Sequence, residues 1–251
     1  MPSKKKSTPE NTRRSPRSSA RPVSDVRTVL NSIESKATAH DRENLKKFGI
    51  TASNAFGVSF GNLKLLGKEL GQNHELAAAL WESGWYEARM LASLIDDPEQ
   101  VTKLQMDRWC RDFDNWGICD TVCFCLFDRV PHAWDKIAQW SVRRREFEKR
   151  ASFALLASHA LHDKVTGDLP FLESLNLIGP AAVDERNFVK KAVNWALRAI
   201  GERSHLLNAS AKELAGRLAE SSDPTSRWIG KDALRQLNTP AAVKRLAARG
   251  R

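Results

Sequence analysis

Hydrophobic positions recur at the three- to four-residue spacing of amphipathic helices along most of this 251-residue chain. This spacing predicts helices over residues 24–30, 62–66, 74–83 and 87–95. No segment shows the sustained alternation of apolar and polar residues that is typical of a half-buried β-strand. The sequence therefore predicts an all-α fold with roughly ten or more helices of ordinary length.

Proline indicates where several of these helices begin. Proline is favoured in the first helical turn because its missing N–H would have no partner there, and a capping oxygen often precedes it. Helix starts are predicted on this basis at Asp97-Pro98, Val130-Pro131, Asp168-Leu169-Pro170, Asp223-Pro224 and Thr239-Pro240.

The second half of the chain indicates a repeat. Helices near Trp116, Arg150, Trp195 and Lys231 each follow a shorter helix, at intervals close to the period of HEAT-type helical pairs. Stacked pairs curve into a solenoid and bring equivalent residues together on its concave face. We therefore predict a HEAT-like helical-repeat solenoid in which residues 24–251 form a single domain.

The formal charge of +10 is unevenly distributed. Residues 1–22 hold seven lysines and arginines and one glutamate, which leaves +4 for the rest. Residues 1–23 offer almost nothing to bury, so we predict a disordered basic tail that adds weak affinity for phosphates. Further basic residues share helix faces in the second half and predict a basic concave face able to hold a phosphate backbone: Lys149, Arg150, Lys190, Lys191, Arg198 and Lys231. Solvated helix faces are the alternative interpretation.

Trp116 and Asp120 are four residues apart in a helical segment, so their side chains share one face. An aromatic ring beside a carboxylate suits binding of a cationic group, since both attract positive charge. The alternative is a core tryptophan next to a solvated aspartate.

The cysteines and histidines show no pattern that predicts a metal or cofactor site, so none is expected. The four cysteines (Cys110, Cys119, Cys123 and Cys125) fall in a short stretch without the paired spacing of a tetrahedral site, so reduced thiols are expected. The histidines His74, His132, His159 and His162 show no ligand spacing with them and are assigned no chemistry. No apolar run reaches the length of a membrane span, and the N-terminus is charged, so we expect a cytoplasmic, membrane-free protein, nucleoid-associated if bacterial.

Three segments resemble the AlkD-type DNA alkylation repair glycosylases, which are built from HEAT-like repeats: NWGICD (115–120), FEKRA (147–151) and FVKKAVNWALR (188–198). The resemblance covers residue 24 to the C-terminus. It implies that Asp120 is the catalytic aspartate, that Trp116 and Trp195 flank it, and that Arg150 helps to hold the DNA backbone. Better-known members carry a tryptophan where Asn115 stands and bulkier or polar residues at Gly117 and Cys119, which leaves the substrate range open.

The implied activity is excision of cationic N3- or N7-alkylated purines from double-stranded DNA, by a monomer and without base flipping. A carboxylate near C1′ would stabilise the oxocarbenium character of the sugar as the base departs. A non-catalytic helical-repeat scaffold that binds nucleic acid or protein is the alternative. Convergence of Trp116, Asp120 and Trp195 would favour the enzyme, whereas an intramolecular ion pair on Asp120 would favour the scaffold. A metal-dependent nuclease would need carboxylates clustered near Asp120, such as Asp112 and Asp114.

Overall fold

A computed structural model gives the fold and describes residues 25–248. In that range the chain forms fourteen α-helices and one 3-10 helix, with no strand, which confirms the all-α prediction. The predicted basic tail, residues 1–23, lies outside the described residues. The helices are α1 (Val26–Glu34), α2 (Ala39–Lys47), α3 (Phe60–Leu70), α4 (His74–Glu82), α5 (Tyr86–Ile95), α6 (Lys103–Arg111), α7 (Trp116–Cys125), η1 (Phe127–Arg129), α8 (Ala133–Ser141), α9 (Glu146–His162), α10 (Leu169–Ala181), α11 (Asn187–Gly201), α12 (His205–Ala219), α13 (Pro224–Leu237) and α14 (Pro240–Ala248).

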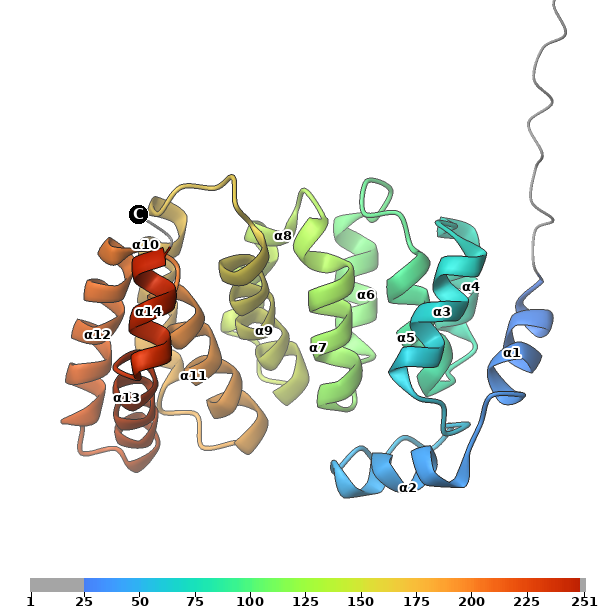
Figure 1. Ribbon diagram of the computed structural model, residues 1–251, viewed down its shortest axis with the longest axis horizontal. Coiled ribbons are helices and arrows are strands. Elements are labelled where there is room, and N and C mark those ends of the chain that lie inside the picture. The colour runs from blue at the N-terminus through green and yellow to red at the C-terminus, as the bar shows by residue number, and fades with distance from the viewer. Residues whose placement is uncertain (1–24, 249–251) are drawn as a thin grey trace, which may run out of the picture.

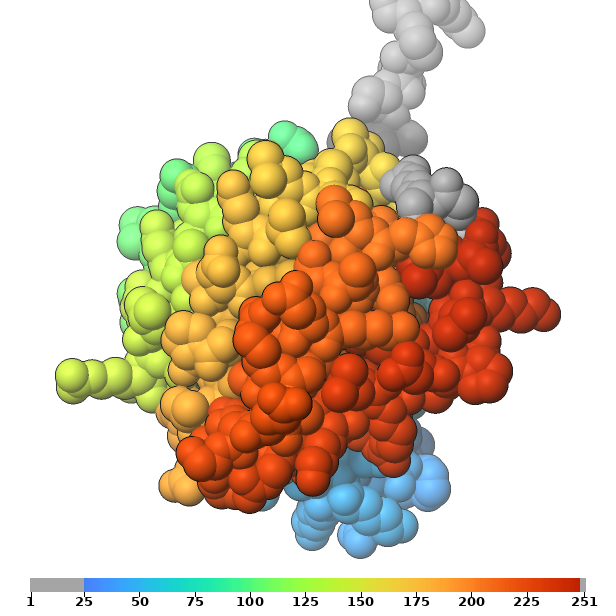
Figure 2. Space-filling view, turned by 90° about the vertical axis from the view of Figure 1, so that its left-hand side faces the viewer, coloured from blue at the N-terminus to red at the C-terminus, as the bar shows by residue number. Residues whose placement is uncertain are grey.

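The helices stack in pairs, as the repeat pattern predicts. The second members contact one another in series, α5 with α7, α7 with α9, α9 with α11 and α11 with α13, and we call them the inner row. Behind them α8, α10 and α12 form a second series, the outer row, and Figure 1 shows the pairs side by side along the molecule. Figure 2 views the molecule from its C-terminal end and shows α2, in blue, at the lower edge and α14, in red, at the right.

Three of the five proline-based helix starts are confirmed, at Asp168, Asp223 and Thr239. Helix α8 begins two residues after Pro131, at Ala133. The start predicted at Asp97-Pro98 is wrong, because the Asp97 carboxylate accepts hydrogen bonds from the following turn, and Thr102 caps α6 instead.

One continuous apolar core runs from α1 to α13. Within it, the fully buried indoles of Trp81 and Trp109 stack with ring centroids 4.0 Å apart. Trp81 donates its indole N–H to Asp112, and buried Trp140 donates to Asp107, both at 2.8 Å. Such pairing removes the cost of burying a polar atom.

A buried carboxylate fastens the segment after α2 to the inner row. Glu87 of α5 is fully buried and accepts backbone N–H groups from Phe56, Gly57 and Val58, at 2.9, 2.7 and 3.2 Å. Gly57 has a φ of +88°, and a Cβ there would lie 2.8 Å from the Arg42 side chain, so glycine is required. This tether fixes α2 relative to α5.

Candidate functional site

The candidate site is built on one face of α7. Asn115 caps this helix by accepting the N–H of Ile118 at 3.0 Å, which sets its start at Trp116. Successive turns then place Trp116, Asp120 and Phe124 on the same face. A Cβ at position 117 would lie 2.7 Å from the Tyr86 hydroxyl, so the close packing of α5 against α7 requires glycine there.

Arg150 of α9 donates hydrogen bonds to both carboxylate oxygens of Asp120. Its Nε donates to Oδ1 at 2.8 Å and its Nη2 to Oδ2 at 2.7 Å, a bidentate arrangement. The third donor, Nη1, binds the carbonyl oxygen of Phe188 at 2.6 Å. Asp120 is therefore locked in an intramolecular ion pair, the arrangement that favours the scaffold interpretation.

Burial dominates the electrostatics of this pair. It raises the pKa of the Asp120 carboxyl above its usual value, and the Arg150 charge offsets this only in part. Burial also lowers the pKa of Arg150, but the attraction of Asp120 outweighs that effect and leaves it raised. Each group therefore depends on the other to remain charged inside the protein.

The two predicted tryptophans lie on opposite sides of Asp120 along the α7 face. Trp116, one turn before Asp120, donates its indole N–H to the carbonyl oxygen of Phe48 at 2.9 Å. Trp195 of α11 stacks on Phe124, one turn after Asp120, with centroids 4.9 Å apart and planes 10° from parallel. The structure thus gathers the three predicted residues in one row, with Trp195 joined to it through Phe124.

The six predicted DNA-binding residues differ in availability. Arg150 is 6% exposed and its donors are engaged, so its geometry fits positioning of Asp120 better than the expected phosphate contact. Lys149 is also engaged, 3.0 Å from Asp184. Lys190 lies over the ring of Trp228, while Lys191 and Lys231 are exposed and Arg198 is partly buried. The contacts of these six residues with DNA remain predictions, as does the basic character of the concave face.

Residues 25–248 contain no group of three or more acidic, histidine or cysteine side chains placed to hold a metal ion. Asp112 accepts the Trp81 indole, and Asp114 accepts from Asn115. The four cysteines form no disulfide, and Cys110, Cys119 and Cys123 are buried. In the same range, no helix is both long and apolar enough to cross a membrane.

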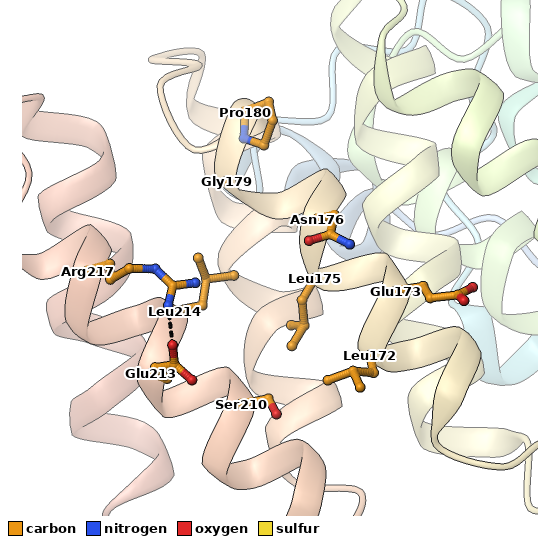
Figure 3. A pocket seen from close by; sticks show the side chains of 10 residues that line it. All are labelled: Leu172, Glu173, Leu175, Asn176, Gly179, Pro180, Ser210, Glu213, Leu214 and Arg217. Carbon is orange, nitrogen blue, oxygen red and sulfur yellow. Dashed lines mark hydrogen bonds and ion pairs between the residues drawn. The ribbon is translucent and has the colours of Figure 1, made fainter.

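A groove of about 540 Å³ opens elsewhere, between α10 and α12 of the outer row (Figure 3). Apolar side chains such as Leu172 and Leu175 line it together with the Arg217–Glu213 ion pair. It contains none of the residues of the α7 face.

Three residues beside the site were not predicted: Phe124, Asp128 and His162. The four-residue spacing from Trp116 through Asp120 leads directly to Phe124, so the sequence carried that signal. Asp128 and His162 are 34 residues apart and meet only because η1 packs against α9.

Comparison with known proteins agrees with this architecture. A family described as DNA alkylation repair enzyme matches residues 29–237. A solved structure described as "a new family of proteins related to the HEAT-like repeat DNA glycosylases with affinity for branched DNA structures" is similar, with a TM-score of 0.69 and 21% identity over 84% of this chain and 95% of that chain. A search of curated protein sequences found no match. The structural similarity confirms the HEAT-like fold.

Proposed function

We propose, from the premise that this chain belongs to the DNA alkylation repair enzyme family, that it binds duplex DNA along its inner row and excises cationic N3- or N7-alkylated purines. The observation that carries this proposal is the row on α7, where Asp120, bound by Arg150, lies between Trp116 and the Phe124–Trp195 stack. Aromatic rings beside a carboxylate favour a cationic centre. The protein would act as a monomer.

The chemistry requires charge stabilisation at the sugar. Alkylation at N3 or N7 makes the base cationic and a better leaving group, and C1′ becomes oxocarbenium-like as the glycosidic bond lengthens. Asp120 would stabilise that charge and orient the attacking water, with Trp116 and Trp195 as walls. The lesion would stay stacked in the duplex while the protein acts from the backbone side.

Arg150 would serve this reaction as a positioning residue. A bidentate guanidinium fixes both the rotamer and the ionised state of the carboxylate it binds. Because Arg150 is itself buried and held by the Phe188 carbonyl, it fixes Asp120 relative to α11 as well.

A second candidate is a DNA-binding protein of the same family that does not excise bases. It is favoured by the same ion pair, because a guanidinium on both oxygens neutralises much of the charge that Asp120 would offer to a cationic sugar. The similar solved structure is likewise described by its affinity for branched DNA rather than by an activity.

Single-turnover excision of 7-methylguanine and 3-methyladenine from methylated duplex DNA separates the two candidates. We expect the parent to release both bases and Asp120→Asn to be slower by about 100-fold or more, with unchanged circular dichroism and similar DNA affinity. Release by both proteins at equal rates would remove Asp120 from the mechanism. If the parent binds DNA but releases no base, the second candidate is established. If adding a chelator abolishes base release, the metal-dependent nuclease becomes a candidate again.

A further inference from the structure

A second acid–base pair lies on the same face as the first, beyond the aromatic stack. His162 at the end of α9 places its Nδ1 2.6 Å from Oδ2 of Asp128 in η1. The Ser158 hydroxyl donates to the same oxygen at 2.5 Å. The Phe124–Trp195 stack therefore lies between the Asp120–Arg150 pair and the Asp128–His162 pair.

The two members of this pair differ sharply in exposure. The Asp128 side chain is 2% exposed, whereas that of His162 is 52% exposed. Oδ1 of Asp128 is buried and has no hydrogen-bond partner among the described residues. A buried carboxylate with so few partners is stabilised by a cation, and a doubly protonated His162 would provide one.

The aromatic contacts show where His162 points its ring. Its imidazole meets Phe124 edge-on, with centroids 5.0 Å apart and planes at 84°. Phe124 in turn stacks on Trp195. Since Asp128 binds Nδ1, Nε2 is the ring nitrogen left for another partner on this half-exposed side chain.

We propose that His162, oriented by Asp128, is a phosphate-binding residue that donates from Nε2 to a phosphodiester oxygen of DNA lying against the Phe124–Trp195 stack. This inference rests on the DNA binding of the proposed function but not on base excision. It assigns the phosphate contact on this face to an exposed histidine in addition to the lysines of α11 and α13. Asp128 supplies the charge and orientation that make Nε2–H a donor.

Donation from Nε2 while Nδ1 is bound to Asp128 requires the imidazolium form, so the contact depends on pH. The charged or titratable groups on the elements next to His162 are Asp128 and Arg129 of η1, His159 of α9, and Asp163 and Lys164 just after α9. Burial lowers the pKa of His159, which keeps that ring uncharged near neutrality. The contact from α7 is the ring of Phe124, which does not titrate.

Binding of a fluorescent, unmodified duplex by the full chain tests this assignment at pH 6 and pH 8 over a range of salt. We expect His162→Gln to weaken binding about tenfold at pH 6 and to lower the salt slope by about 0.9. The parent should bind more weakly at pH 8, and His162→Gln should lose most of that pH dependence. His205→Gln, which removes an exposed histidine from α12, should behave like the parent.

A second variant tests whether Asp128 orients His162. Asp128→Asn should weaken binding at pH 6 nearly as much as His162→Gln, because the ring loses its orienting charge. If the parent binds and His162→Gln matches it in affinity, salt slope and pH dependence, the inference is wrong while the proposed function stands. If the parent does not bind DNA, both are wrong.

Discussion

Arg150 donates to both carboxylate oxygens of Asp120 across 30 residues of sequence, and the guanidinium is almost closed to solvent. A buried ion pair contributes little net stability compared with a well-packed apolar pair, but removing one partner leaves an uncompensated charge. The two residues should therefore behave as a unit in stability measurements.

Replacing Arg150 with methionine should lower the free energy of unfolding by about 3–5 kcal/mol, because Asp120 is left buried without its partner. The double variant Asp120→Leu with Arg150→Met should recover most of that loss. Urea unfolding of both single variants and the double variant gives the coupling directly. Arg145→Met, at the exposed start of α9, is the control. If Arg150→Met lowers the free energy of unfolding no more than Arg145→Met does, the coupling is contradicted.

Asp184 should make stability fall under acidic conditions. Its hydrogen bond with Arg186, aided by Lys149, lowers its pKa to about 2 from the usual 3.8. A carboxyl with a lower pKa in the folded state stabilises the protein above about pH 4, and that contribution is lost as the pH falls toward 2. Asp184→Asn should remove this part of the pH dependence, as measured by thermal unfolding from pH 2 to pH 6. An unchanged profile would show that the ion pair has no net effect.

The exposed lysines of α11 and α13 should contribute more to DNA binding than Lys149. Lys191→Ala and Lys231→Ala are each expected to weaken duplex binding and reduce the salt slope by about 0.9. Lys149→Ala should change the slope less, because its Nζ is 3.0 Å from Asp184. Equal slopes for the parent and both exposed-lysine variants would place DNA on another face.

Gly230 and Gly216 should respond oppositely to alanine. A Cβ at Gly230 would lie 2.3 Å from the backbone nitrogen of Ala219 and 2.5 Å from the carbonyl oxygen of Ala215, so α12 and α13 would have to separate. We expect Gly230→Ala to cost about 3 kcal/mol of stability. Gly216 has nothing within 4 Å of such a Cβ, so alanine there should be neutral or stabilise by up to about 1 kcal/mol. Thermal unfolding of both variants decides this.

Local patterns were sufficient to predict the helices and several of their first residues. Asp223, for example, caps α13 through the N–H of Ser226, and Pro224 follows it, so both signals lie within a few residues. At Asp97 the same signals were present, but the side chain bonded to its own turn instead. Such competition between a cap and a turn depends on side-chain geometry that spacing does not reveal.

The candidate site was predicted only in part, because local spacing places residues of one helix but not residues of different helices. Trp116 and Asp120 belong to one helix, so periodicity alone places them on one face. That Arg150 binds Asp120 rather than solvent, and that His162 reaches Asp128, depends on how α7, η1 and α9 pack. Exposure is likewise set by tertiary packing, which is why Trp228 is 42% exposed while Trp81 is fully buried.

The hydrogen bond from Trp116 to the Phe48 carbonyl spans 68 residues of sequence and ties the candidate site to the end of α2. One wall of the site is therefore completed by the beginning of the described chain. A shortened protein that starts after Phe48 would keep every residue assigned to catalysis but would release the indole of Trp116, so truncation would be a poor way to isolate a minimal active unit.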